Sequence, residues 1–135
     1  MKQTKAPAYK HLVLLGGGHS HVSVIKSFGM NPIPGVEVTV VCRDVHTPYS
    51  GMLPGLIAGH YTFDEAHIDL DKLCAFSQVN FVHDEVVALD PAERVLKFAD
   101  RPDLAYDVLS INTGSSPDLH SVPGAQEFAV PVKPI

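Results

Sequence analysis

The sequence predicts one α/β domain, in which helices pack on a parallel sheet and an antiparallel hairpin or meander covers one side. Three observations support this prediction. Continuous apolar runs at 11–15 and 36–42 have the form of strands buried on both faces of a parallel sheet. Apolar residues at helical spacing lie between these runs. Further along, 85–90 and 94–99 have the pattern of two strands joined by a short turn.

Composition and charge narrow the class of protein. The 135 residues suffice for one domain with one core, and the net charge of −5 disfavours nucleic acid or an anionic membrane surface as a partner. No apolar stretch is long enough to cross a bilayer, and the N-terminus lacks the pattern of a signal peptide, so we expect a cytoplasmic protein. Cys42 and Cys74 lie far apart, which indicates neither a disulfide framework nor a dithiol redox motif.

The first elements predict a βαβ unit. A strand at 11–15 leads through the glycines at 16–18 into a helix at 20–30, for which Ser20 is a candidate N-cap. The β-branched strand at 36–42 completes the unit, and its crossover should be right-handed.

The remaining elements are less regular. The segment 43–62 is rich in glycine, proline and aromatic residues, and a short helix at 52–59 would be broken by its Pro-Gly pair. A helix is expected at 67–76 and a strand at 78–84. Within 106–118 an apolar strand runs into a turn rich in glycine and serine.

The domain boundaries follow from these elements. We expect residues 1–10 to be a flexible N-terminus, 11–118 to form the domain, and 119–135 to be a connector rich in proline. The tail stops without completing any element, which predicts that the chain is part of a longer protein.

The turn Gly16-Gly17-Gly18 has the residues needed to bring backbone close to a phosphate. A strand–glycine–helix junction presents unpaired N–H groups at the positive end of a helix dipole. Gly16 permits a tight turn, and Gly18 lets the main chain approach a pyrophosphate. His21 stands where a third glycine is usual, so we expect it to push the helix outward or to turn its imidazole away from the strand. Taken alone, the turn either binds a dinucleotide or merely connects two core elements.

The end of the second strand departs from the usual pattern of a dinucleotide site. An Asp or Glu normally stands there to hold the adenine ribose, whereas this chain has Cys42 followed by Arg43 and Asp44. A thiol is a poor substitute for a carboxylate. Asp44 could hold the ribose only if the register of the second strand is shifted. Arg43 is suited to stack on adenine or to contact a phosphate.

The eight histidines do not predict a metal site, because no acidic or thiol partner stands at ligand spacing. His19 and Ser20 instead stand at the helix start, where an imidazole or a hydroxyl could donate a hydrogen bond to a phosphate. Simple N-capping is the alternative role for Ser20.

Three motifs, "GGGHSHV", "TPYSGMLPG" and "YDVLSINTGSSPD", give the chain a family resemblance. It resembles the N-terminal FAD-binding part of the pyridine nucleotide-disulfide oxidoreductase superfamily, in the branch of type II NADH dehydrogenases and sulfide:quinone reductases. Within that branch it is similar to the flavoprotein module fused to selenide, water dikinase in some organisms. The resemblance covers 11–135 and implies a Rossmann-like FAD/NAD(P)-binding fold of three layers.

The resemblance also implies the positions of cofactor contacts. Thr113 and Gly114 would turn the chain beside the FAD pyrophosphate, and the backbone around Val86 would face the adenine. The segment 47–55 would lie along the ribityl chain and the flavin ring, with contacts from Pro48, Tyr49, Ser50 and Met52. The alternative for this segment is a surface loop whose apolar side chains pack on the core. No pair of redox cysteines follows the first helix, so dithiol chemistry is not expected.

The function implied is FAD binding within a flavin-dependent NAD(P)H oxidoreductase. There a nicotinamide delivers hydride to FAD, which passes electrons to a quinone or another acceptor. A separate NAD(P)H-binding domain would follow the connector, so we expect this chain alone to be inactive and to retain FAD weakly. The competing hypothesis is a non-catalytic dinucleotide sensor or docking module for another enzyme, such as selenide, water dikinase. A homodimer and peripheral membrane attachment through other segments stay open.

Overall fold

The computed structural model describes residues 10–132 and confirms the predicted α/β architecture. Four strands form a parallel sheet in the order β5-β2-β1-β9. These are β1 (Lys10–Leu15), β2 (Val36–Cys42), β5 (Asn80–His83) and β9 (Val108–Ile111). The chain builds outward from β1 to β5 and then returns to the other side of β1. This reversal creates a switch point between β1 and β9.

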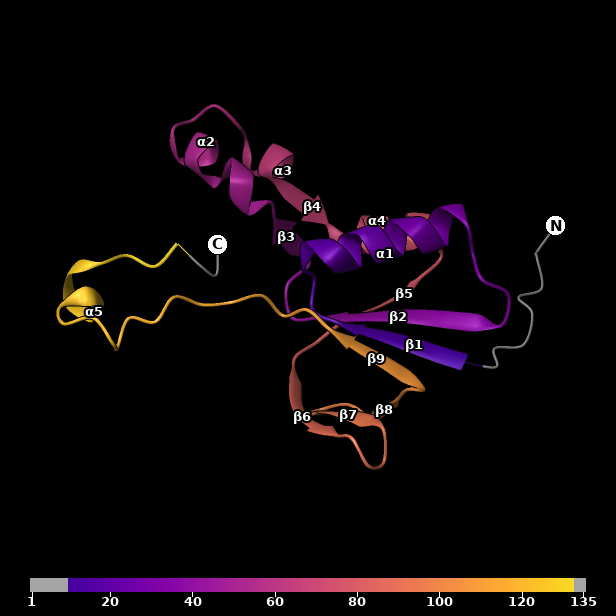
Figure 1. Cartoon of the computed structure of the whole chain (residues 1–135). Coiled ribbons are helices and arrows are strands. Elements are labelled where there is room, and N and C mark those ends of the chain that lie inside the picture. Colours follow the sequence, from indigo (N-terminus) through magenta and orange to yellow (C-terminus); the bar gives the residue numbers. More distant parts are fainter. Residues whose placement is uncertain (1–9, 133–135) are drawn as a thin grey trace.

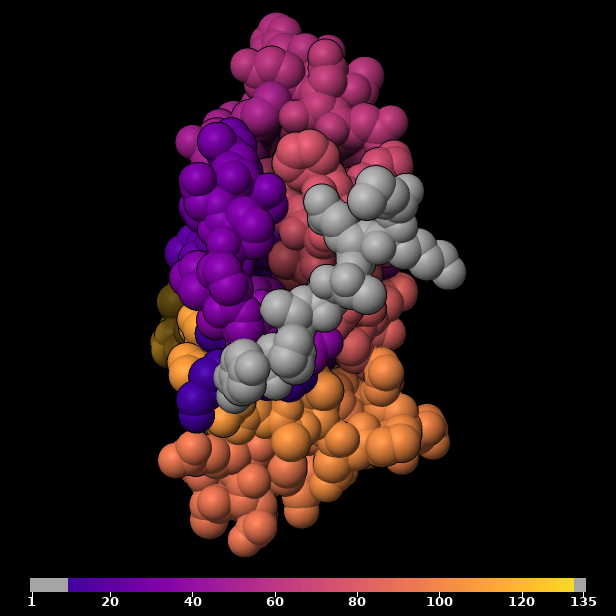
Figure 2. Space-filling view, turned by 90° about the vertical axis from the view of Figure 1, so that its right-hand side faces the viewer, coloured from indigo at the N-terminus to yellow at the C-terminus, as the bar shows by residue number. Residues whose placement is uncertain are grey.

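Two helices cover one face of the sheet, and a meander covers the other (Figure 1). The helices are α1 (His19–Met30) and α4 (Leu70–Ser77), which contact each other. The antiparallel meander consists of β6 (Val86–Asp90), β7 (Val95–Phe98) and β8 (Leu104–Ala105). Figure 2 shows α1 and α4 side by side, with the meander below them. The predicted three layers, including the meander, are therefore confirmed.

The alternation of side chains along β1 and β2 creates two apolar layers. Leu14 and Val40 belong to a buried cluster that includes Ile25 of α1. Their neighbours Val13 and Val41 belong to a second cluster, on the side of the meander. Both faces of these strands are therefore buried, which explains why their sequences are continuous apolar runs.

Residues 46–69, which lie between β2 and α4, form an arm that projects from the carboxyl edge of the sheet (Figure 1). At its base, β3 (His46–Pro48) pairs antiparallel with β4 (His67–Asp69). Its outer part contains the 3₁₀ helix η1 (Ser50–Met52) and the short helices α2 (Leu53–Ile57) and α3 (Phe63–Ala66). The segment rich in glycine and proline is thus ordered.

Several predicted boundaries differ from the structure. The Pro-Gly pair does not break the helix predicted at 52–59, because Pro54 lies in the first turn of α2, where an N–H would have no intrahelical partner. The helix predicted at 67–76 starts later, because Asp69 caps α4 by accepting a hydrogen bond from the Lys72 N–H. The strand predicted at 78–84 starts later, after Gln78 ends α4 in the left-handed region.

The described residues after β9 form a tail that stands apart from the sheet (Figure 1). The tail leaves β9 at the carboxyl edge and contains the short helix α5 (Ala125–Phe128), within the predicted connector (Figure 1). The predicted flexible N-terminus falls largely outside the described residues, although Lys10 already belongs to β1. Over residues 10–132, no helix combines the length and apolar character needed to cross a membrane.

His21 connects the helix layer to the sheet. Its side chain is only 2% exposed, with Nδ1 2.7 Å from the Gly16 carbonyl oxygen and Nε2 2.9 Å from the Ser110 Oγ. Since a carbonyl only accepts, Nδ1 carries the proton, and in the neutral ring Nε2 accepts from the Ser110 hydroxyl. The expectation that the imidazole would turn away from the strands is therefore wrong. The ring bonds to Gly16, directly after β1, and to Ser110 of β9.

We predict that His21→Ala lowers the free energy of unfolding by about 2–4 kcal/mol, because it opens a cavity and removes the partner of the buried Gly16 carbonyl and of the half-buried Ser110 hydroxyl. Chemical denaturation followed by circular dichroism measures this change. His120→Ala, at an exposed histidine, is the control and should change stability little. Equal effects of the two substitutions would contradict this role of His21.

Candidate functional site

A cavity of about 960 Å³ lies at the carboxyl edge of the sheet. Its walls come from the glycine turn, the residues after β2, the arm and the loop after β9. Predicted site residues that line it are Gly18, His19, Cys42, Arg43, Pro48, Ser50, Thr113 and Gly114. The structure thus gathers segments that are up to a hundred residues apart around one space.

The two predicted backbone bends lie against each other. A Cβ added to Gly16 would stand 2.1 Å from the Asn112 carbonyl oxygen and 2.8 Å from the Thr113 Cα. Gly16 also has a φ of +97°, so both space and backbone conformation require glycine there. The turn after β1 and the turn after β9 therefore straddle the switch point.

The N–H groups of the glycine turn are engaged within the protein. Gly16 donates to the Val41 carbonyl at 2.8 Å, and Gly18 donates to the Asn112 carbonyl at 3.3 Å. The first N–H bonded within α1 is that of Val22, which donates to Gly18. The N–H groups of His19 and Ser20 precede this bond and point out of the helix start. Donors for an anion are therefore in the first turn of α1 rather than on Gly16 and Gly18.

Gly18 has a packing role as well. A Cβ on it would stand 2.2 Å from the Asn112 Nδ2, and the same amide donates to the Ser20 Oγ at 2.6 Å. The sequence offers Ser20 as a candidate N-cap of α1, but Ser20 does not hold that position. That position is held by Gly18, without a side-chain hydrogen bond. The Ser20 hydroxyl accepts from Asn112 instead and keeps its own proton to donate.

His19 is oriented toward the arm. Its Nε2–H donates to the Pro48 carbonyl at 3.0 Å, and its ring centroid is 5.0 Å from that of Tyr49. In the neutral ring only the Nδ1 acceptor remains. The hydrogen bond from this imidazole to a phosphate stays a prediction, while His19 also offers its backbone N–H and its tie to Pro48.

The bend after β9 is open beside Gly114, which lines the cavity. Gly114 has a φ of +81°, and no atom lies within 4 Å of the place where its Cβ would stand. Thr113, Ser115 and Ser116 line the cavity beside it. A bulky group can therefore approach this backbone directly.

The arm contributes one wall through residues 47–50. The buried Thr47 hydroxyl donates to the Gly17 carbonyl at 2.6 Å, which attaches the arm to the glycine turn. Pro48 and Ser50 line the cavity. Tyr49 is 51% exposed and, like Met52, is not part of the lining. Only the beginning of the predicted segment 47–55 therefore borders the cavity.

Two further predicted contacts lie elsewhere. Gly16 is beneath the turn, between Val41 and Asn112. Val86 pairs with Phe98 at the start of the meander and packs against the core cluster on that side. Neither residue is part of the cavity lining.

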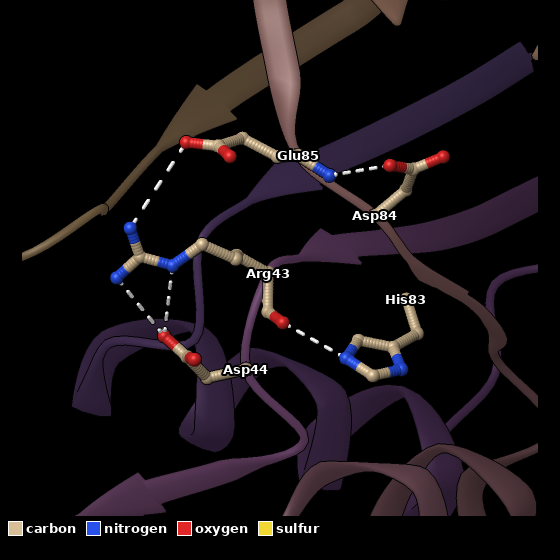
Figure 3. Close-up of polar contacts among 5 residues, drawn as sticks. All are labelled: Arg43, Asp44, His83, Asp84 and Glu85. Carbon is tan, nitrogen blue, oxygen red and sulfur yellow. Dashed lines mark hydrogen bonds and ion pairs between the residues drawn. The ribbon is translucent and has the colours of Figure 1, made fainter. Parts of the chain in front are cut away.

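The end of β2 combines the half-buried thiol of Cys42 with an ion-pair cluster around Arg43. Figure 3 shows this cluster. Burial raises the pKa of the Cys42 thiol, which therefore stays neutral at pH 7. The guanidinium of the following residue, Arg43, lies between two carboxylates. Its Nη2 is 3.3 Å from the Asp44 Oδ2, and its Nη1 is 4.0 Å from the Glu85 Oε1. Asp44 lines the cavity together with Cys42 and Arg43.

Sequence reasoning missed an aromatic cluster at the base of the arm. The rings of Phe63 and His67 stack at 3.7 Å, and His46 meets Phe63 edge-on at 5.5 Å. All three residues line the cavity. No local pattern signals this cluster, because the β3–β4 pairing brings together residues about twenty positions apart.

Within that cluster, His67 carries an unpartnered atom. Its Nδ1–H donates to the Phe63 carbonyl at 2.7 Å, which leaves Nε2 as the acceptor in the neutral ring. The side chain is only 9% exposed, and Nε2 has no partner among the described residues. A buried polar atom without a protein partner is uncommon, and at a cavity wall it can accept a hydrogen bond from a ligand or from a water.

Among known proteins, no protein-family model matches the chain. The chain is 27% identical over 122 residues to the epsilon subunit of NADH-dependent phenylglyoxylate dehydrogenase from Aromatoleum evansii, a match that covers 89% of the chain and 29% of that protein. It therefore spans less than a third of this relative.

Solved structures show the same architecture. The sulfide:quinone oxidoreductase of Aquifex aeolicus matches with a TM-score of 0.73 and 22% identity, over 87% of this chain and 27% of that one. The water-forming NADH oxidase of Lactobacillus brevis, solved with NADH, matches with a TM-score of 0.67 and 19% identity, over 88% and 28%. As the sequence resemblance predicted, the chain has the same fold as the matched parts of these two oxidoreductases.

Proposed function

We propose that the cavity holds FAD and that the chain is the FAD-binding part of a flavin-dependent NAD(P)H oxidoreductase. One observation carries this proposal: the glycine turn and the Thr113–Gly114 bend meet at the switch point between β1 and β9. Open α/β sheets bind ligands outside the carboxyl ends of their strands at such points. The first turn of α1 adds N–H donors and the positive end of a helix dipole.

The cavity and its lining residues fit a dinucleotide such as FAD. The cavity volume of about 960 Å³ is within the range of cofactor sites. The backbone N–H groups of His19 and Ser20, with the open bend at Gly114, would hold the diphosphate. Pro48, Ser50 and His67 would border the flavin half, and the residues after β2 would border the adenosine half.

FAD, when bound, would accept hydride from NAD(P)H and pass the electrons to a quinone or another acceptor. The chain's own residues bind and orient the group. The sulfide:quinone oxidoreductase and the NADH oxidase among its structural neighbours support this reaction class. The chain covers less than a third of each, so the nicotinamide site and the acceptor are part of the proposal.

Flavin absorbance tests the proposal. The natural full-length protein is purified, incubated with FAD, desalted and reduced anaerobically with NADH or NADPH. Bound flavin that bleaches supports the oxidoreductase. Bound flavin that stays oxidised contradicts it and favours a non-catalytic dinucleotide module, while a protein that takes up no flavin contradicts both.

Gly114→Ala should weaken FAD binding about tenfold or more, because a Cβ would extend into the space proposed for the diphosphate. Gly59→Ala is a matched control: Gly59 has a φ of +79°, its Cβ position is also open, and it lies outside the cavity lining. Both substitutions should cost similar stability, about 1 kcal/mol, from the positive φ. Fluorescence titration with FAD measures the affinities. Equal FAD affinity of the two variants would oppose this placement.

His67→Asn should weaken FAD binding about tenfold, since it keeps a donor near the Nδ1 position and removes the Nε2 acceptor. His67→Gln, which keeps a polar group near the Nε2 position, should bind more tightly than the Asn variant. Thermal melting verifies that both variants fold. The reverse order of affinities would show that Nε2 does not face the cofactor.

A further inference from the structure

We infer that the aromatic cluster of His46, Phe63 and His67 receives a planar heteroaromatic ring, and that the His67 Nε2 accepts a hydrogen bond from an N–H on the edge of that ring. This inference rests on the proposed function and adds the residues that recognise a ring of the cofactor. It is drawn from the hydrogen bonds, burial and ring geometry of the cluster at the cavity wall.

The β3–β4 pairing turns one face of the arm's base toward the cavity (Figure 1). Pro48 stands directly opposite His67 in this pairing, and His46 lies two residues before Pro48. Opposite residues of an antiparallel pair share a face, and so do residues two apart on one strand. All three residues line the cavity. The intervening Thr47 donates to the Gly17 carbonyl, which attaches this base to the glycine turn.

The imidazole of His67 is held in one orientation. Its Nδ1–H donates to the Phe63 carbonyl at 2.7 Å, and the two rings stack at 3.7 Å with 16° between their planes. Phe63 is itself fixed at the start of α3 by a capping box, in which Thr62 and Glu65 exchange hydrogen bonds. The Nε2 lone pair lies in the plane of the imidazole, so its direction is fixed as well.

This lone pair has no protein partner. Within residues 10–132, two buried side-chain atoms lack a hydrogen-bond partner, the His67 Nε2 and the Ser77 Oγ. The Ser77 Oγ would lie 2.6 Å from a Cβ on Gly29, and Ser77 is not part of the cavity lining. His67 is part of that lining, and with Nδ1 protonated its neutral ring only accepts at Nε2. A donor from the cavity, on a ligand or on a water, therefore completes it.

The surroundings of Nε2 favour a planar ring as that donor. Phe63 is 52% exposed, and His46 meets its ring edge-on at 5.5 Å. A ring that donates an N–H in the imidazole plane can lie coplanar with His67 and therefore parallel to Phe63. This is the offset-stacked arrangement that aromatic rings prefer. A water or a flexible polyol would gain the hydrogen bond without the aromatic contact.

FAD has two ring edges with this chemistry, the N3–H of the flavin and the 6-amino group of the adenine. We assign the flavin edge, because His67 stands opposite Pro48 in the wall proposed for the flavin half. The adenosine half is placed beside the residues after β2. The adenine amino group is the second source of the same donor, and the experiment separates the two.

Binding of three dinucleotides tests the inference: FAD, FAD methylated at the flavin N3, and FAD with unsubstituted purine in place of adenine. The natural full-length protein, freed of flavin, should bind FAD about tenfold more tightly than the N3-methyl analogue, because a buried acceptor loses its donor. It should bind the purine analogue as tightly as FAD. In His67→Asn, which removes the Nε2 acceptor, the preference for FAD over the N3-methyl analogue should shrink several-fold.

His60→Asn is the matched control, because His60 is an exposed histidine of the same arm and lies outside the cavity lining. It should keep the full preference, and thermal melting verifies that both variants are folded. A preference over the purine analogue that shrinks in His67→Asn would support ring recognition and assign it to adenine.

Two results would overturn the inference while FAD binding stands. One is equal binding of all three dinucleotides by the unsubstituted protein. The other is a preference that His67→Asn leaves unchanged or that His60→Asn removes equally, since Nε2 would then face only water. A protein that binds no FAD would overturn the proposed function, and this inference with it.

Discussion

The candidate site depends on the parallel pairing of β1 with both β2 and β9. This pairing places the carboxyl ends of the three strands at one edge, so the turns that follow them must meet. The contact is close: Gly16 donates to Val41 of β2, and Gly18 donates to the residue after β9. Any shift of β9 by one residue would turn its side chains to the opposite faces and separate the two turns.

Histidine at the third position of the glycine turn gives another solution to helix–strand packing. A glycine there would allow close approach through the absence of a side chain. His21 instead fills the space with a ring whose two nitrogens are both hydrogen-bonded. A buried imidazole with both partners present carries little desolvation penalty, and it links α1, the turn and β9 directionally. The turn is therefore held by a polar network as well as by apolar contact.

The arm completes the cavity through a few contacts at its base. Thr47 bonds to the carbonyl of Gly17, and His19 bonds to the carbonyl of Pro48, so the arm and the turn are joined from both directions. The outer helices of the arm are short and expose apolar side chains such as Ile57. The β3–β4 pairing at the base of the arm places His67 at the cavity wall, where Phe63 of α3 stacks on it.

The sequence by itself determined the elements whose signals are local. Continuous apolar runs predicted the buried strands, helical spacing predicted α1, and the glycines at 16–18 predicted a tight turn between them, because each signal depends on neighbouring residues. The tertiary structure decided the distant partners of Gly18, His21 and Arg43, namely Asn112, Ser110 and Glu85, which lie 42 to 94 positions away. Those partners follow from strand order, which the chain's local pattern does not encode. Elements were therefore predictable from short-range physics, whereas the chemistry of the site came from long-range packing.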